Sequence, residues 1–376
     1  MIEGSSVSTI SNEMRGMLVD SVSKFVDAEY DFETRRNLSD SELGYSADHW
    51  QTFAELGWLS VPLTESVGGL GGTLADLSEL VEQFGRGLVL EPYFSSVVLA
   101  ASVISQGENT ALAAEVLPQL AMGELILSLA WEESECGSNP LRITSTANSE
   151  NSNFILNGEK IVVLAAPQAH AFVVSAKIDG SDNIGLFYLP KTTPGLTLES
   201  YTLVDGARAA TLVFDNVVVT QDQLISADGS EILEKTIRMG AYLLCCEALG
   251  AMEKLSQTTV DYTKTRKQFG TSLSSFQVLR HTLADIYVII KKTRCFANQC
   301  TQKLRDGGEL SVEDVAVLKV QTGRAAHFVS RQAIQIHGGI GMTDELNVGH
   351  YAKRLTALDA LLGNERYHLQ AIASAL

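Results

Sequence analysis

The hydrophobic spacing of the chain changes twice along its 376 residues, and this constrains the fold more than any other feature. Residues 1–125 repeat apolar side chains at the spacing of amphipathic helices, residues 126–226 form short runs typical of β-strands, and residues 227–376 return to helical spacing. No long helical stretches separate the short runs, which excludes the alternating strand–helix pattern of a parallel sheet. The sequence therefore predicts an α+β protein with N-terminal helices, a middle antiparallel sheet or barrel, and a C-terminal helical bundle.

Turn residues in the middle region indicate where its strands end. Asn-Gly at 157–158 lies between two short apolar runs and is typical of a two-residue hairpin turn. Asp-Gly-Ser at 179–181 predicts a hairpin between strands at 171–177 and 184–189, and Asp-Asn at 215–216 is expected to separate two further short strands. We therefore expect three tight turns in this region.

Charge and composition exclude several classes of protein. Lys and Arg number 28 and Asp and Glu 45, so the net charge of −17 leaves no general basic face for nucleic acid. The N-terminus lacks the basic stretch and apolar run of a secretory signal, and the most apolar helical run, 240–252, is too short to span a membrane. The five cysteines form no CxxC pair, which fits a reducing compartment. We expect a cytoplasmic protein without a membrane span.

Common motifs for metal binding and hydrolysis are missing from the sequence. It contains no HExxH and no GxSxG, and its seven histidines are scattered, so neither a metal site nor a serine hydrolase is expected. The glycine-rich stretch at 68–72 has the spacing of neither GxGxxG nor a P-loop, and we interpret it as a flexible loop before the next helix.

Two polar clusters in the C-terminal region are candidate binding sites. The first places Arg266, Phe269 and Gln277 at a loop between two predicted helices, where a guanidinium can bind a pyrophosphate through two hydrogen bonds. The second places Gln335 just before Gly-Gly at 338–339, whose backbone N–H groups can approach an anion. Taken alone, the first cluster is equally consistent with an exposed cationic turn, and the second with an ordinary helix end.

Together, and in this order behind a helical and a β region, the clusters resemble the acyl-CoA dehydrogenase family. The likeness extends to the segments 62–72, 136–139 and 157–160 and covers nearly the whole chain. It implies the fold of that family: an N-terminal helical domain, a middle β-barrel and a C-terminal four-helix bundle.

The resemblance also implies a reaction and a cofactor. The family uses FAD to convert an acyl-CoA thioester to a 2-enoyl-CoA, with a carboxylate that removes the α-proton. The resemblance further implies that an electron-transferring flavoprotein accepts the electrons from the reduced FAD. In the family, the residues of the two clusters hold the FAD of a neighbouring subunit. Carried onto this sequence, the FAD-binding positions are Arg266, Phe269, Gln277, Gln335, Gly338, Gly339 and Ser138.

The chain departs from the family at the catalytic base. Counted from the glycine pair, the usual base position falls on Leu362, which cannot accept a proton. An earlier position used by some members falls on Gly240. Glu247 lies two turns further along the same helix face, among apolar neighbours that could raise the pKa of a carboxyl. Glu247 is therefore a candidate base, and the alternative is that it pairs with a polar group.

The positions that would surround this chain's own flavin have also changed. The family's Thr-Glu-Pro is replaced by Glu132-Glu133-Ser134, where negative charge disfavours a reduced flavin, and its Trp-Ile-Thr is replaced by Val-Val-Leu at 162–164. Residues that contribute to a neighbour's FAD are intact, whereas those for its own are not. This contrast suggests the complementary subunit of an α2β2 dehydrogenase, acting with a second acyl-CoA dehydrogenase-like chain on a bulky acyl-CoA such as a steroid side chain.

Two other interpretations stay open. The chain could be a self-sufficient homo-oligomeric dehydrogenase with Glu247 as its base, or a scaffold that keeps the fold without redox activity. The first predicts flavin and activity in the chain alone, and the second predicts that Arg266→Ala leaves the flavin content of any complex unchanged.

Overall fold

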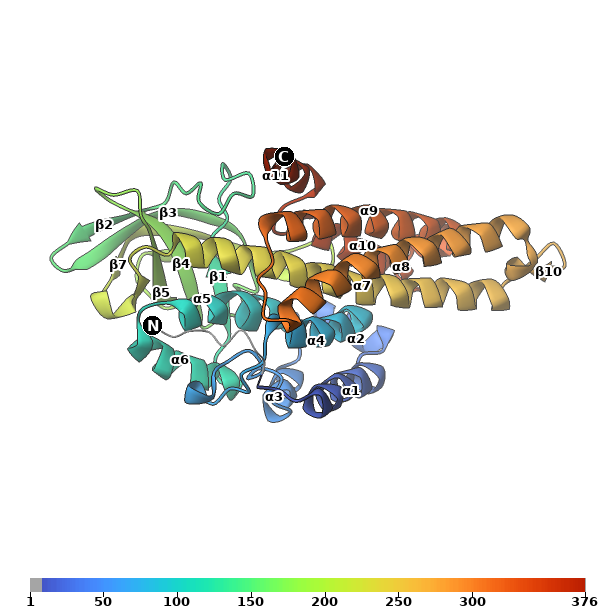
Figure 1. Ribbon diagram of the computed structural model, residues 1–376, viewed down its shortest axis with the longest axis horizontal. Helices are drawn as coiled ribbons and strands as arrows, with labels where there is room; N and C mark the ends of the chain where they lie inside the picture. The colour runs from blue at the N-terminus through green and yellow to red at the C-terminus, as the bar shows by residue number, and fades with distance from the viewer. Residues whose placement is uncertain (1–8, 376) are drawn as a thin grey trace. The chain divides into compact units, whose positions relative to one another are not determined.

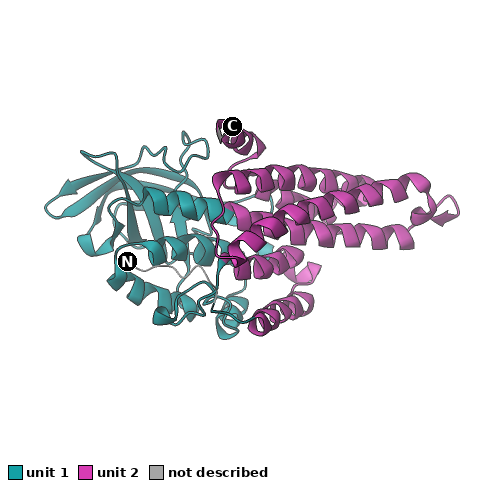
Figure 2. Ribbon diagram, viewed as in Figure 1, with its two compact units in different colours: residues 1–11, 38–73, 90–240 teal, residues 12–37, 74–89, 241–376 magenta. Residues whose placement is uncertain are grey.

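The computed structural model describes residues 9–375; residues 1–8, at the start of the stretch where no secretory signal is expected, and residue 376 lie outside it. The chain divides into two compact units (Figures 1 and 2). Unit 1 contains residues 38–73 and 90–240 with the start of the chain up to Ser11, and unit 2 contains residues 12–37, 74–89 and 241–376. Helices from the N-terminal third of the chain therefore belong to both units.

Unit 1 is built around a sheet of eight strands (Figure 1). The strands are β1 (Leu127–Ala130), β2 (Thr146–Glu150), β3 (Asn153–Leu164), β4 (Ala171–Ile178), β5 (Ile184–Pro190), β6 (Leu196–Thr202), β7 (Arg208–Val219) and β8 (Leu224–Ser226). They lie in the order β6-β7-β3-β2-β4-β5-β8, with β1 paired to β4. The predicted middle β domain is confirmed with two corrections: the sheet is open rather than a closed barrel, and β4 pairs in parallel with β1 and β2.

Two of the three predicted turns lie inside long strands instead. β3 and β7 pair antiparallel, with Leu156 opposite Val217 and Gly158 opposite Phe214, so Asn157 faces the two residues 215–216. This is a β-bulge, and the Oδ1 of Asn157 accepts the backbone N–H of Asn216 at 2.9 Å. The turn predictions at 157–158 and 215–216 were wrong because an amide side chain and a left-handed backbone also stabilise a bulge. The hairpin at 179–181 is confirmed between β4 and β5.

Short helices complete unit 1. They are α3 (Ala47–Glu55), the π-helical turn η2 (Phe94–Ala100), α5 (Ala101–Gln106) and α6 (Thr110–Ala121). Trp50 of α3 is buried, and its Nε1–H donates to the carbonyl of Gly123 after α6 at 3.1 Å. The Oγ of Ser96 in η2 accepts the backbone N–H of Leu127 at 2.8 Å, which joins the helices to the first strand.

Unit 2 is helical (Figure 2). Its helices are α1 (Asn12–Glu29), most of α2 (Phe32–Asp40), α4 (Leu74–Gly87), α7 (Ser230–Thr265) from Ala241 onward, α8 (Gln277–Arg305), α9 (Val312–His337), α10 (Val348–Ala360) and α11 (Glu365–Ala375). α9 begins with a capping box, because Ser311 accepts the N–H of Asp314 and Asp314 accepts that of Ser311. No helix within residues 9–375 is long and apolar enough to cross a membrane.

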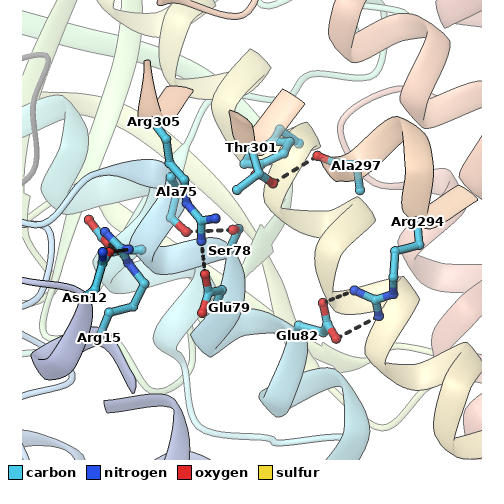
Figure 3. Close-up of polar contacts among 12 residues, drawn as sticks. Asn12, Arg15, Ala75, Ser78, Glu79, Glu82, Arg294, Ala297, Thr301 and Arg305 are labelled. Atoms are coloured by element: carbon cyan, nitrogen blue, oxygen red, sulfur yellow. Dashed lines mark hydrogen bonds and ion pairs between the residues drawn. The ribbon is translucent and has the colours of Figure 1, made fainter. Parts of the chain in front are cut away.

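Close backbone contact and ion pairs hold α4, α7 and α8 together. Gly85 of α4 lies against the backbone of Glu247, and Gly250 of α7 lies against the backbone of Glu82. Glu82 also accepts two hydrogen bonds from Arg294 of α8, at 2.9 and 2.8 Å (Figure 3). One helical turn before Glu82, Glu79 accepts a single hydrogen bond from Nη2 of Arg305 (Figure 3). The glycines permit the close approach, and the arginines compensate the carboxylates beside it.

Candidate functional site

The loop after α7 presents the first predicted cluster. Arg266 follows the helix directly, and a small hairpin of β9 (Lys267–Gln268) and β10 (Thr271–Ser272) carries Phe269 at its turn. Phe269 is 93% exposed with a positive φ of 53°, and its ring lies edge-on to that of Phe276. A large aromatic side chain held in solvent by a left-handed turn suggests contact with another molecule.

The second cluster lies where α9 ends. Gln335 is exposed in the last turn, and the helix ends at Gly338, which has a φ of 67°. A Cβ built on Gly338 or Gly339 would meet no atom within 4 Å. The backbone at this turn therefore borders open space, as the approach of a ligand to its N–H groups requires.

A stacked ring pair joins the two clusters at one end of unit 2. Tyr262, one turn before Arg266, stacks on His337 with ring centroids 4.2 Å apart. The Nδ1–H of His337 donates to the carbonyl of Ala333 at 2.8 Å, and burial lowers the pKa of the ring. Leu273 N–H donates to the carbonyl of Arg266 at 2.9 Å, which ties the loop to the segment that leads into α8. The structure thus brings the two predicted clusters together.

The side chains of this end fit a dinucleotide. Arg266, Gln277 and Gln335 are all exposed, and among residues 9–375 no protein group makes a hydrogen bond or ion pair with their side chains. One guanidinium, two amides and an open glycine turn form the donor set that a pyrophosphate and its neighbouring oxygens require. These residues could therefore hold the FAD that the resemblance implies.

Ser138, the remaining predicted FAD position, belongs to unit 1. Gly137 and Ser138 both have positive φ, of 58° and 68°, in a turn closed by the N–H of Asn139 and the carbonyl of Cys136 at 3.0 Å. Serine rarely adopts this conformation, so local propensity does not explain the turn. Ser138 is half-buried within the unit.

Near this turn, Glu133 and Lys160 form a buried ion pair. The Nζ of Lys160 lies 2.6 Å from Oε1 of Glu133 and donates to Ser175 Oγ at 3.1 Å, and the N–H groups of Thr144 and Ser145 also donate to the carboxylate. Burial opposes the charge of Glu133, but Lys160 and these donors outweigh it and lower the pKa to about 2. Burial lowers the pKa of Lys160 to about 8. Both groups are charged at neutral pH, so the charge of Glu133 is compensated.

Glu132 and Val162 are the two positions where the expected flavin surroundings differ most. Burial alone raises the pKa of Glu132, which makes this carboxyl easier to protonate. Val162 has a φ of 48° and donates its N–H to Tyr201 Oη at 2.9 Å. A β-branched residue at positive φ costs about 1–3 kcal/mol and is usually kept at a functional segment. Because Lys160 compensates the charge of Glu133, only the carboxyl of Glu132 still argues against a reduced flavin in unit 1.

Glu247, the candidate base, is held by an arginine. It is 6% exposed on α7, and its Oε1 lies 2.6 Å from both Nε and Nη2 of Arg354 on α10. A guanidinium that binds a carboxylate in this way competes with any incoming proton donor for its lone pairs. The arrangement agrees with the alternative that Glu247 pairs with a polar group, and the role of base stays a prediction.

Glu247→Gln separates these two roles. If the ion pair with Arg354 is what Glu247 provides, the variant should lose about 1.5–3 kcal/mol of unfolding free energy, the contribution of a charged hydrogen bond. Arg354→Gln should cost a similar amount, and the double variant should cost less than their sum. Urea unfolding measures all three. Unchanged stability together with loss of dehydrogenase activity would instead identify Glu247 as the base.

The usual base position of the family, Leu362, lies in a fixed corner between α10 and α11. The Nζ of Lys319, only 3% exposed, donates to three carbonyls at the end of α10, including Leu361 at 2.8 Å. His368 Nε2–H donates to the carbonyl of Leu362 at 3.1 Å. Leu362 itself has a φ of 55° and is 4% exposed. These hydrogen bonds hold the corner in place, but it carries no ionisable side chain at the position of the base.

Two buried lysines beside predicted site positions, Lys160 bound to Glu133 and Lys319 bound to the carbonyl of Leu361, were missed by the sequence analysis. Lys160 lies in register with buried Phe154 and Leu156 on one face of β3, where alternation predicts an apolar residue. Lys319 lies in the apolar stripe of α9 that contains Val315 and Ala326. The signal that could have identified both is a lysine at a position where the strand or helix period predicts an apolar residue.

Comparison with protein-family models places most of the sequence in one family. The N-terminal, middle and C-terminal domain models of acyl-CoA dehydrogenases match residues 12–124, 128–217 and 227–376. An acyl-CoA dehydrogenase of Mycolicibacterium smegmatis is 26% identical over 362 residues, which cover 96% of this chain and 98% of that protein. The human mitochondrial short-chain specific acyl-CoA dehydrogenase is 28% identical over 318 residues, covering 82% of this chain and 77% of that protein.

Solved structures agree with this assignment. The Tcur3481-Tcur3483 steroid acyl-CoA dehydrogenase variant is 27% identical, with a TM-score of 0.87 over 96% of this chain and 97% of that one. The ChsE4-ChsE5 complex from Mycobacterium tuberculosis shares the fold, with a TM-score of 0.88 over 97% of each chain at 24% identity. Because all three domain models match in order along the chain, the protein belongs to the acyl-CoA dehydrogenase family.

Proposed function

We propose that this chain is the complementary subunit of an α2β2 acyl-CoA dehydrogenase, in which it completes the FAD site of a partner chain. The observation that carries the proposal is a contrast within the chain. The exposed donors of Arg266, Gln277 and Gln335 gather at one end of unit 2, whereas Leu362 occupies the base position and Glu247 is bound to Arg354. The chain therefore presents donors suited to a cofactor, whereas neither of the two candidate base positions, Leu362 and Glu247, offers a free carboxylate.

Each residue of the cluster has a role that follows from its chemistry. Bound FAD supplies the acceptor for the hydride removed in α,β-dehydrogenation of an acyl-CoA. Arg266 would bind the pyrophosphate through two charge-assisted hydrogen bonds, and Gln277 and Gln335 would bind neighbouring oxygens. The turn at Gly338 and Gly339 would admit the cofactor close to the backbone, because no side chain fills that space. In this proposal the partner chain supplies the proton acceptor.

The substrate, electron acceptor and compartment follow from the same proposal. The likeness to a steroid acyl-CoA dehydrogenase at 27% identity supports a bulky acyl-CoA, such as a steroid side-chain thioester. An electron-transferring flavoprotein would reoxidise the flavin. The five cysteines are all free thiols, which suits the reducing cytoplasm.

Flavin content tests the proposal. The chain purified alone should be colourless, and its complex with a co-expressed acyl-CoA dehydrogenase-like chain that keeps a catalytic Glu should contain about half a flavin per chain, one per pair. Visible absorbance divided by chain concentration measures this. Close to one flavin per chain in the protein alone would show a self-sufficient enzyme and would make Glu247 the base to examine.

Arg266→Ala should remove most of the flavin from that complex. Loss of a charged hydrogen-bond donor to a phosphate costs about 1.5–3 kcal/mol, or a roughly 10- to 100-fold weaker affinity for FAD. Lys267→Ala, at the adjacent exposed position, is the matched control and should retain the flavin. Equal flavin content in both variants would favour the non-enzymatic scaffold.

A further inference from the structure

A polar cavity in unit 2 is lined by the ends of α1 and α4, the starts of α2 and α10, and one residue of α7. Its volume of about 250 Å³ is several times the roughly 30 Å³ that one water molecule occupies in the liquid, so it has room for a small molecule. Every residue that lines it belongs to unit 2, and none of them is assigned to FAD or to the candidate base. The cavity is therefore separate from the proposed FAD site.

Three helices each bring a cation to the wall of this cavity: Arg35 of α2, Arg86 of α4 and Lys254 of α7. Arg35 is only 3% exposed, and the other two are half-buried. Arg86 donates to neutral oxygens, to Gln83 Oε1 at 2.8 Å and to Ser23 Oγ at 3.4 Å. Lys254 makes no hydrogen bond or ion pair within the described part of the chain. Arg86 and Lys254 therefore have no carboxylate bound to them by a hydrogen bond.

Two carboxylates, Asp27 and Asp31, also line the cavity, and both are exposed. Asp31 is engaged at the start of α2, where its Oδ1 accepts the backbone N–H of Thr34 at 2.7 Å. Asp27 Oδ1 lies 3.9 Å from Nη2 of Arg86, beyond hydrogen-bond distance. Water solvates these two carboxylates more fully than it solvates the cations, so the charge nearest the protein interior is positive. Asp27 is the group with which an incoming anion would compete for Arg86.

The helix ends at the cavity are arranged to admit an anion. Carbonyls at the end of α4, which would repel negative charge, already accept hydrogen bonds: Tyr351 Oη donates to that of Arg86, and Arg35 Nε donates to that of Leu88 at 3.0 Å. Asn347 precedes the first residue of α10, and its side chain makes no capping hydrogen bond. The start of this helix has a partial positive charge, and the Asn347 amide adds a donor at the wall.

We propose that this cavity binds a small oxyanion, a phosphate or a carboxylate, through Arg86, Lys254 and Asn347. A guanidinium offers two parallel N–H groups to such an anion, an ammonium offers a compact charge, and buried Arg35 adds to the positive potential. Because the three ligating residues come from α4, α7 and the start of α10, a bound anion would join these helices and stabilise unit 2. The inference does not depend on the proposed function.

Calorimetric titration of the full chain with inorganic phosphate, in a chloride buffer of constant ionic strength, tests the site. We expect Lys254→Met to weaken phosphate binding by about tenfold or more, the contribution of one charged hydrogen bond. Asp27→Asn should strengthen binding, because it removes the carboxylate that competes for Arg86. Lys292→Met removes an exposed cation of α8 that does not line the cavity, and it should leave the affinity unchanged. A parallel titration with acetate distinguishes a carboxylate ligand from a phosphate.

The opposite effects of Lys254→Met and Asp27→Asn identify the site, and the exposed position of Asp27 makes the second variant safe for folding. Binding of acetate in place of phosphate, with the same response to both variants, would support the site and assign it to carboxylates. The inference is overturned if neither anion binds, or if Lys254→Met and Lys292→Met bind equally well. Loss of phosphate binding in Arg266→Ala would also overturn it, because the anion would then lie at the proposed FAD site.

Discussion

Gly250→Ala is expected to destabilise unit 2 by about 3 kcal/mol or more, the upper end of the cost of overpacking a core. A Cβ built on Gly250 would lie well inside van der Waals contact with the carbonyl oxygen of Glu82 and 3.2 Å from the backbone N of Arg86. Both atoms belong to the backbone of α4, so no change of rotamer can relieve the overlap. The helices would have to separate, which would also strain the hydrogen bonds between Glu82 and Arg294.

Gly16→Ala is the matched control for this variant. Gly16 is also a helical glycine, on α1, but a Cβ built on it meets no atom within 4 Å. Alanine there should raise the unfolding free energy by up to about 1 kcal/mol, because it favours the helix. Urea unfolding followed by circular dichroism compares the two variants. A Gly250→Ala protein as stable as the wild type would mean that α4 and α7 do not cross in such close contact.

Local sequence patterns predicted the kind of structure in each region but not how the strands were connected. Helical and strand periods depend on neighbouring residues, so the three regions and the hairpin at 179–181 could be identified from spacing. The Asn-Gly at 157–158 could not, because the same residues form a turn or a bulge depending on the strand opposite. Only the pairing of β3 with β7 decides between them, and the paired residues are about 60 positions apart in sequence.

The same distinction between local patterns and long-range contacts applies to the candidate site. The grouping of Arg266, Gln277 and Gln335 at exposed positions at one end of unit 2 could be predicted because they lie in short motifs, and their role in binding FAD stays a prediction. The partner of Glu247 could not be predicted, since Arg354 is on a different helix and neither residue has a local signature. The same applies to Lys160, whose counterion on another segment of unit 1 turns an unfavourable buried charge into a stable pair.

Lys160→Met is expected to cost about 3–5 kcal/mol of stability in unit 1, because it leaves the buried Glu133 carboxylate without its cation. Lys160 is fully buried, and its Nζ lies 2.6 Å from Glu133. Lys177→Met is the matched control on β4: its ion pair with Asp182 is exposed, so the change should be below about 1 kcal/mol. Adding Glu133→Gln to Lys160→Met should recover part of the loss, since the uncompensated charge is removed.

The pH dependence of the unfolding free energy distinguishes the loss of this ion pair from a general packing defect, which would not depend on pH. In the wild type, the pKa of Glu133 is lowered from 4.5 to about 2, so its stabilisation is present above pH 4.5 and is lost as the pH falls toward 2. Without Lys160, only the hydrogen bonds from Thr144 and Ser145 oppose the effect of burial, so the pKa of the carboxyl is higher than in the wild type and protonation costs the variant less stability. The difference in unfolding free energy between wild type and Lys160→Met should therefore be largest near pH 7 and should narrow below about pH 4. A difference that stays constant with pH would show that Lys160 contributes packing rather than charge, and that Glu133 carries no compensated charge in unit 1.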